Sequence, residues 1–538
     1  MERILARRQF MRVLTATGLS AAFAGSLLDR ASAARGGPSD ADILQLALTA
    51  EYLAADAYTK SLFGGFQGLV KDYLEAALAQ EEAHVKALRD TLSALGVRPV
   101  EKPSFAYPVE FLPRNQLAIL RLLNALEDAF VGAYLGALPL IQSKDVLKAA
   151  GAILGNEAAH RATVRASRIL LGDQELPGPR SPRTGPLRWP SPRRRRRRRF
   201  RDLSGSEPAW ERPRGRPRGL RHIQTRGLGR REGRGGRTQA PRGRLGMRKT
   251  VLEARLSRRE ALRRAGALGA GAVLGGAVTA CTTTAQTPNL DVAVLNFALN
   301  LEYLEGLFYL AATGRLSELN QVGGNAQIVL PPGFDGTSPV PGLTGDLLAL
   351  ANEIADDEKA HVLFLRQALG SQAVNRPVID FYNSFNAIRS GFNPFNDPIS
   401  FFVGAFVFED VGVTAYNGAA PLITDKQNVL APAAGILATE AYHAGAIRRY
   451  LIEVRNQPVP GTGLTVEQLA NAISNARNTL AGGGDQGLTV MGTPNNVAAD
   501  QNGVAFSRTT DGVLKIVYLN AQKQPGGFFP QGLNGQIK

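Results

Sequence analysis

Four of the five histidines in this chain lie three residues after a glutamate, and this spacing constrains the fold more than any other feature of the sequence. The pairs are Glu81/His84, Glu157/His160, Glu358/His361 and Glu440/His443. Residues three apart on a helix project from the same face, so each pair presents a carboxylate and an imidazole together. A hydrogen-bonded pair facing solvent is the usual explanation of one such spacing, but it does not explain four.

A lone glutamate precedes each of these pairs along the chain. They are Glu51 and Glu127 in the first half and Glu302 and Glu409 in the second half. The sequence around each lone glutamate has apolar residues at three- and four-residue spacing, which is typical of amphipathic helices. Glu51, for example, is in line with Leu44, Leu48 and Tyr58. The lone glutamates are therefore predicted to lie on apolar helix faces.

The same order of residues occurs twice because the chain contains an internal duplication. Residues 126–141 align without gaps with residues 408–423, and Glu51-Tyr52-Leu53 matches Glu302-Tyr303-Leu304. The segment ending in His84-Val85 likewise matches the segment ending in His361-Val362. We place the two units at 39–172 and 287–456.

Each unit is predicted to be all-α, with four amphipathic segments separated by Gly- and Pro-containing breaks. Four such segments suit a four-helix bundle, so we expect two bundles in the chain. In the first unit the segments run over 40–63, 68–95, 114–138 and 144–171.

Four carboxylates and two imidazoles converging on one bundle core are best explained by bound cations. A buried carboxylate without a partner costs several kcal/mol of desolvation. Four negative charges balance two divalent ions, and mixed oxygen and nitrogen ligands suit iron or manganese. We expect no catalytic residues beyond the ligands themselves. The predicted ligands are Glu51, Glu81, His84, Glu127, Glu157 and His160 in the first unit, and Glu302, Glu358, His361, Glu409, Glu440 and His443 in the second.

Tyr134 and Tyr416 lie two turns past the lone glutamates Glu127 and Glu409. Either tyrosine is a partner of the site, as a hydrogen-bond donor or radical relay, or it is core packing with a bonded hydroxyl. Core packing is the commoner role of such a residue.

With these residues in view, both units resemble the ferritin-like superfamily, which has one Glu on each of two helices and Glu-x-x-His on the other two. The second unit, with Asn300-Leu301-Glu302-Tyr303-Leu304-Glu305 and the Gly526-Gly527-Phe528-Phe529-Pro530 tail, resembles its desiccation-associated branch. That tail belongs to a C-terminal extension, 457–538, which we expect to be irregular. The resemblance implies ferroxidase, peroxidase, manganese catalase or oxygenase chemistry without choosing among them.

The formal net charge of +17 comes from one segment. Residues 177–246 hold 23 Arg, no Lys and four acids, a net charge of +19, which leaves −2 for the rest of the chain. Such dense like charge predicts a disordered linker. Because arginine without lysine is typical of GC-rich DNA read out of frame, we hypothesise that two adjacent genes are joined here. Specific nucleic-acid binding would rest on this linker alone, so we expect none, and His222 within it receives no role.

Two segments have the pattern of export signals. Residues 1–34 combine Arg7-Arg8, an apolar run and Ala31-Ser32-Ala33, which is typical of a twin-arginine signal. Residues 247–281 repeat the pattern and end on Val278-Thr279-Ala280-Cys281, which resembles the lipobox of bacterial lipoproteins. Cys281, the single cysteine, is therefore predicted to be lipidated. An ordinary amphipathic helix is the alternative for the first segment, and a buried Ala-rich helix is the alternative for the second.

These patterns together predict an exported, stress-protective protein of the periplasm or cell envelope. It would oxidise Fe(II) or consume peroxide at two iron or manganese ions in each bundle. Its partners would be metal ions and O2 or peroxide, with a membrane contact through a lipid anchor or signal segment; an oligomer stays open. The alternative is a non-catalytic, metal-stabilised protein that protects the envelope during drying.

Overall fold

The computed structural model describes residues 37–107, 115–173 and 289–538. Several sequence predictions lie outside these residues. They are the signal segment 1–34, the linker 177–246, and the second signal-like segment 247–281 with Cys281.

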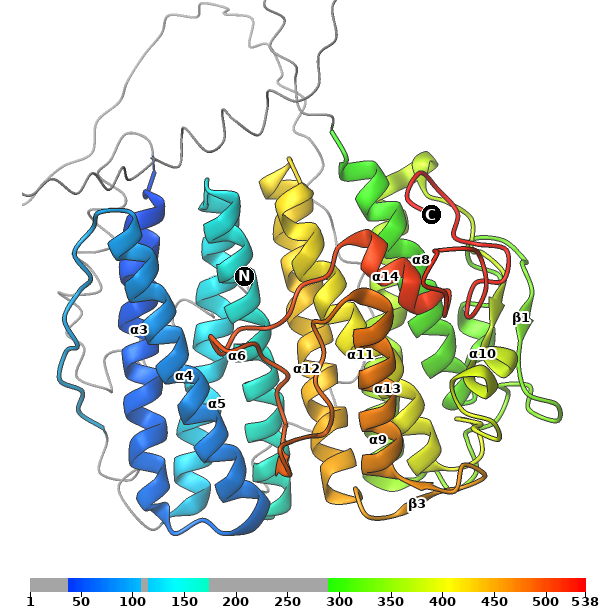
Figure 1. Cartoon of the computed structure of the whole chain (residues 1–538), viewed down its shortest axis with the longest axis horizontal. Helices are drawn as coiled ribbons and strands as arrows, with labels where there is room; N and C mark the ends of the chain where they lie inside the picture. Colours follow the sequence, from blue (N-terminus) through cyan, green and yellow to red (C-terminus); the bar gives the residue numbers. More distant parts are fainter. Residues whose placement is uncertain (1–36, 108–114, 174–288) are drawn as a thin grey trace, which may run out of the picture. The chain divides into compact units, whose positions relative to one another are not determined.

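The first unit forms a bundle of four helices, drawn in blue to cyan in Figure 1. Ser39 caps the first helix through a capping box with Asp42, while Asn115 and Ser143 cap the third and fourth. Gly65, at φ 74°, follows the first helix, where the sequence predicted a break. The elements are α3 (Asp40–Ser61), the 3-10 helix η1 (Leu62–Gly64), α4 (Gly68–Ala94), α5 (Gln116–Ala137), the 3-10 helix η3 (Leu138–Leu140) and α6 (Lys144–Leu170).

The second unit repeats this arrangement with longer connections. Residues between its first two long helices form irregular structure with one short strand, and a second strand pairs with it in parallel. The elements are α8 (Asp291–Ala312), η4 (Leu316–Glu318), β1 (Ile328–Val329), α9 (Gly345–Leu369), η5 (Gly370–Gln372), β2 (Ile379–Asp380), α10 (Phe381–Ile388), α11 (Pro398–Ala419), η6 (Ala420–Leu422), the π-helical turn η7 (Lys426–Leu430) and α12 (Ala431–Glu453). The all-α fold with two bundles is thus confirmed.

The C-terminal extension is only partly irregular. Its first helix begins with a capping box between Thr465 and Gln468, a signal that is readable in the sequence. Two two-residue antiparallel ribbons and a second short helix complete it. The elements are β3 (Pro458–Val459), β4 (Leu464–Thr465), α13 (Val466–Ala481), β5 (Thr489–Val490), β6 (Thr493–Pro494) and α14 (Thr510–Val517).

The extension explains why α8 and α11 are apolar on nearly every face. Both α13 and α14 pack on α11, and Phe528 packs against Phe408. The segment Pro398–Leu422 is long and apolar enough to cross a membrane, with a mean hydropathy of 1.4. Because 94% of its most apolar stretch is buried inside the protein, it is accounted for as a core helix.

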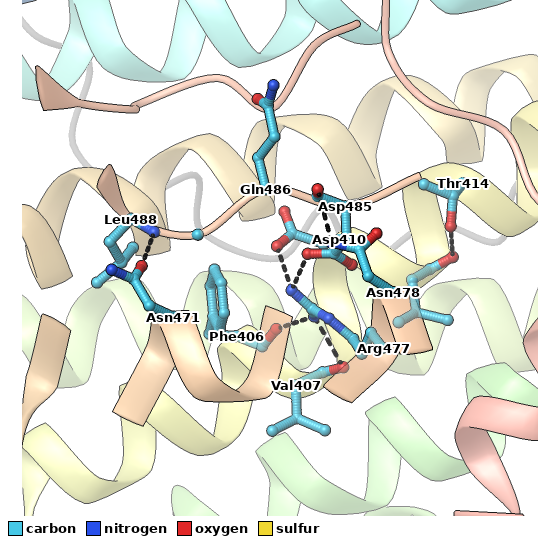
Figure 2. Close-up of polar contacts among 12 residues, drawn as sticks. Phe406, Val407, Asp410, Thr414, Asn471, Arg477, Asn478, Asp485, Gln486 and Leu488 are labelled. Carbon is cyan, nitrogen blue, oxygen red and sulfur yellow. Dashed lines mark hydrogen bonds and ion pairs between the residues drawn. The ribbon is translucent and has the colours of Figure 1, made fainter. Parts of the chain in front are cut away.

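Buried ion pairs fasten the extension to the second bundle (Figure 2). Arg477 of α13 contacts Asp410 of α11 at 2.9 Å and Asp485 at 2.8 Å. Arg448 of α12 makes two bonds to Asp410, and Arg508 contacts Asp485 at 2.6 Å. Three arginines therefore share two carboxylates in the protein interior, where removal of one partner leaves a buried charge unpaired.

Helix α6 of the first bundle packs against α12 of the second, and both bundles belong to one compact unit. Small residues allow this contact. A Cβ added to Gly445 would stand 2.9 Å from the carbonyl oxygen of Ala159 and 3.1 Å from its Cα. Arg165 adds an ion pair with Glu353 at 2.9 Å. A single hydrophobic core accordingly contains residues of both bundles.

The ion-pair network gives a prediction about stability. Asp410→Asn leaves the buried Arg448 and Arg477 without their shared charge and should lower the free energy of unfolding by about 3 to 5 kcal/mol. Asp128, the aligned residue of the first bundle, is exposed and pairs with Arg161, so Asp128→Asn should cost less than about 1 kcal/mol. Urea unfolding of both variants measures the difference, and equal losses would contradict the assigned role.

Candidate metal centre

The six predicted ligands of the first bundle converge in its core, one set from each helix. Glu51 comes from α3 and Glu127 from α5, while α4 and α6 supply the Glu-x-x-His pairs. Their ligand atoms form two overlapping groups, each within 4.8 Å. Glu81 and Glu157 belong to both groups, so these two carboxylates would be shared if each group held an ion. The groups are Glu51, Glu81, His84 and Glu157, and Glu81, Glu127, Glu157 and His160.

Each histidine of the first bundle turns its Nδ1 atom toward the carboxylates. Nδ1 of His84 lies 3.1 Å from Glu51, 3.4 Å from Glu81 and 3.3 Å from Glu157. Nδ1 of His160 lies 2.9 Å from Glu81 and 4.0 Å from Glu127. The Nδ1 atoms are therefore the nitrogens placed to bind an ion.

The second bundle repeats this geometry, except that Glu358 is the one residue that belongs to both of its groups. Nδ1 of His361 lies 3.1 Å from Glu302, 3.5 Å from Glu358 and 3.4 Å from Glu440. Nδ1 of His443 lies 3.1 Å from Glu358 and 3.5 Å from Glu409. All twelve predicted residues thus fall into two clusters of six. The groups in this bundle are Glu302, Glu358, His361 and Glu440, and Glu358, Glu409 and His443.

A tyrosine holds each lone glutamate from the opposite helix. Tyr134 donates to Glu51 and Tyr416 donates to Glu302, so both tyrosines singled out in the sequence contact the clusters. The sequence did not reveal their counterparts on the first helix of each bundle, Tyr58 and Tyr309. These donate to Glu127 and Glu409 respectively.

The carboxylates retain acceptor capacity that the protein does not use. Both oxygens of Glu81, Glu157, Glu358 and Glu440 are buried and accept no hydrogen bond within the described residues. Protein polar groups in such surroundings are almost always bonded. Unused oxygens arranged around two imidazole nitrogens fit divalent cations with mixed oxygen and nitrogen ligands. The twelve residues therefore suit iron or manganese, and their assignment as ligands stays a prediction.

Burial and crowding of like charges shift the acidities of these groups. Burial raises the pKa of Glu51 and of Glu302 to about 7 in each case. Burial, together with the neighbouring carboxylates, holds the pKa of Glu127 and of Glu440 well above the usual range. The surrounding glutamates overcome the effect of burial on His84 and raise its pKa well above normal. Without metal, the clusters therefore retain protons.

The second ring nitrogen of three of the histidines contacts a partner outside the cluster, which orients the imidazole. These partners were not identified from the sequence. Nε2 of His160 lies 2.7 Å from Oε1 of Gln80, and Nε2 of His443 lies 3.4 Å from Asp357, the residue aligned with Gln80. Nε2 of His84 lies 2.6 Å from the carbonyl oxygen of Gly503 in the C-terminal extension. Such contacts fix which ring nitrogen is free to bind a metal.

Two aligned positions beside the clusters carry chemically different residues in the two bundles. Ala54 and Phe130 of the first bundle align with Glu305 and Gly412 of the second. A Cβ added to Gly412 would stand 3.4 Å from Glu305 and 2.3 Å from Glu440, so Glu305 lies in the space that a bulky residue would fill. Glu305 lines a cavity with Leu301, Val411, Ile516 and Phe528. The second cluster thus has a fifth buried carboxylate.

Comparisons with known proteins agree with this geometry. The profile of the ferritin-like domain matches residues 39–169 and 290–453, together more than half of the chain. The chain is 28% identical over 274 residues to the ferritin-like catalase Nec2 of Nesocodon mauritianus. It is 29% identical over 279 residues to the desiccation-related protein PCC13-62 of Craterostigma plantagineum. Each alignment covers 46% of this chain and 84% of the relative. No solved structure matches the chain significantly.

The raised pKa values of Glu51 and Glu302 give a prediction about metal binding. Glu51 and Glu302 must lose protons before they bind a cation, so metal affinity should rise as the pH increases through about 7 and fall below it. Calorimetric titration of the metal-free protein with Mn(II), in buffers of different ionisation enthalpy, measures the protons released. Affinity that is constant between about pH 6 and pH 8, with no proton release, would contradict the prediction.

Proposed function

The chain belongs to the ferritin-like domain family, and from this premise we propose that each bundle holds two iron or manganese ions with which the protein consumes hydrogen peroxide. The observation that carries the proposal is the convergence of four buried carboxylates and two imidazole Nδ1 atoms in each bundle. The name of the Nesocodon relative, a ferritin-like catalase, favours peroxide over the other substrates of such centres.

The proposed reaction is disproportionation. Two molecules of hydrogen peroxide give two of water and one of O2, so one peroxide gains two electrons and two protons while the other loses them. A pair of redox-active ions supplies the site that stores those two electrons between the half-reactions. No external reductant or net proton is required.

The protein's own residues would organise this reaction in two ways. Glu81, Glu157 and Glu358 each belong to both ligand groups of their cluster, and they would be the carboxylates shared by the two ions of a centre. The tyrosine hydroxyls on the lone glutamates keep one oxygen of each occupied, which orients the other toward the cluster. Burial of all these groups excludes bulk water.

Glu305 is the residue best placed to carry a proton at the second centre. It lies beside Glu440 without belonging to either group of predicted ligands, and it faces the cavity lined by Leu301 and Ile516. Burial and the charges of Glu440, Glu358, Glu409 and Glu302 hold its pKa well above the usual range. A carboxyl group in this position can give a proton to one peroxide and receive one from the next.

A second function has one observation in its favour. The Craterostigma relative is named a desiccation-related protein, and a metal-stabilised bundle without turnover is compatible with the same residues. Oxygen evolution from hydrogen peroxide by the metal-loaded protein distinguishes the two proposals. A protein that loses thermal stability on chelation but evolves no oxygen would favour the protective role.

The ligand assignment predicts the outcome of a double substitution. Glu127→Gln together with Glu409→Gln keeps the shape of both cores but removes one carboxylate charge from each cluster. Metal content should fall well below that of the unchanged protein, and oxygen evolution should be lost, while circular dichroism stays helical. Asp128→Gln, at the exposed neighbour of Glu127, is the matched control. Unchanged metal content in the double variant would refute the assignment.

The role of Glu305 predicts a different pattern. Glu305→Gln should lower the rate of oxygen evolution by about 10²-fold or more, the usual contribution of a proton-transferring group, while metal content stays constant. Elemental analysis and rate measurement on one preparation test both parts. If the variant loses metal instead, Glu305 is a ligand; if its rate is unchanged, Glu305 carries no proton.

A further inference from the structure

A loop of the C-terminal extension, residues 496–506, covers the metal cluster of the first bundle. It is fastened at its far end to α11 of the second bundle. Asn417 donates to the carbonyl oxygens of Ala505 and Phe506, and Arg508, just after the loop, donates to Thr414. The same loop bonds to the first bundle, since the amide of Ala505 donates to the carbonyl of Ala152 on α6. A segment that follows the second bundle thus reaches the first.

The loop contacts residues in and around the first cluster. The carbonyl oxygen of Gly503 lies 2.6 Å from Nε2 of His84 and also accepts from Asn156, the neighbour of Glu157. The carbonyl of Val497 accepts from Gln80, which in turn holds His160. The loop therefore touches the outer partners of both histidines, and both histidines are fully buried.

This position of the loop requires a glycine, Gly503. Its φ is +71°, a conformation that glycine adopts without strain. A Cβ at this residue would stand 2.8 Å from the carbonyl oxygen of Gln80 and 3.1 Å from Cβ of Ala83. Only glycine lets the loop approach α4 closely enough for its carbonyl to reach His84.

The second cluster lacks this cover among the residues that the structure describes. His361, aligned with His84, is 8% exposed, whereas the other eleven predicted ligands are at most 1% exposed. No hydrogen bond from its Nε2 is found in the described ranges. Gly412 and Glu305 also place a cavity beside Glu440, where the first bundle has Phe130 and Ala54. The second cluster is therefore slightly exposed at His361, and it has a cavity beside it at Glu305.

We propose that the loop 496–506 of the extension seals the first metal centre, so that the two centres are inequivalent and only the second exchanges readily with small molecules from solvent. The first centre then holds its ions tightly and supports the fold, while the second is the one that peroxide reaches. The inference rests on the proposed function in one respect, that both bundles hold metal.

The kinetics of metal release test this inference without any measurement of activity. Metal-loaded full-length protein is mixed with an excess of a coloured chelator, and ions should leave in two phases of equal amplitude. Glu409→Gln, which disables the second centre, should remove the fast phase. Glu127→Gln, which disables the first, should remove the slow phase. A protein that binds no metal at all would refute the proposed function, whereas one phase, or the opposite assignment of phases, would refute only the seal.

Substitution of Gly503 tests the loop itself. Gly503→Val should accelerate the slow phase by about 10- to 100-fold, the usual effect of losing an outer partner of a metal-bound histidine, and leave the fast phase unchanged. Gly492→Val is the matched control, because Gly492 has a similar φ of +81° but no atom within 4 Å of an added Cβ. If Gly503→Val does not fold, Gly503→Ala replaces it. A slow phase that either folded variant leaves unchanged would overturn the proposal.

Discussion

The cost of removing carboxylates from water governs this structure. Twelve ionisable side chains lie on the inner faces of eight helices, at positions where a bundle would otherwise place leucine or alanine. Their mutual repulsion and loss of hydration oppose folding, as the raised pKa values of Glu127 and Glu440 indicate. Divalent cations bound there would reverse the sign of that contribution, because the same oxygens that repel one another would become ligands. Fold and chemistry are therefore linked through one set of residues.

The duplication shows which features this constraint fixes and which it leaves free. Glutamates, histidines and the four tyrosines that hold the lone glutamates recur at aligned positions, because each contacts the cluster directly. The surroundings differ. Asp128 is exposed in the first bundle, whereas the aligned Asp410 is buried, pairs with Arg448 and Arg477, and joins the extension to α11. Gly412 stands where the first bundle has Phe130, and Glu305 stands where it has Ala54. The space beside the second cluster is therefore acidic, whereas the corresponding space in the first bundle is apolar.

The sequence predicted the helices and the clusters because both depend on short-range periodicity. Glu51 in line with Leu44 and Leu48 already placed a charge on an apolar face, and Glu-x-x-His spacing placed two ligands on one helix turn. It did not predict the carbonyl of Gly503 beside His84, since that contact joins residues 419 apart and uses only a backbone atom of Gly503. Tyr58 and Gln80 were missed for a related reason, because their partners lie on other helices. The helix α13 was missed although Thr465 and Gln468 form a readable capping box.

The linker and the two signal-like segments suggested that the two bundles come from two adjacent genes. The packing of the described residues is the same whether the bundles belong to one polypeptide or to two. Helices α6 and α12 pack together, and one core contains residues of both bundles, so the two units behave as one folded body. Two polypeptides that met through the same surfaces would form the same clusters. The C-terminal extension would then act between chains rather than within one.

Elemental analysis of protein purified from its own host, without added metal, tests the central claim most directly. If the two clusters are dinuclear centres, about four ions of iron or manganese accompany each pair of bundles, and substitution of the lone glutamates lowers that number. A preparation with intact helical structure and less than one equivalent of any transition metal would contradict the account.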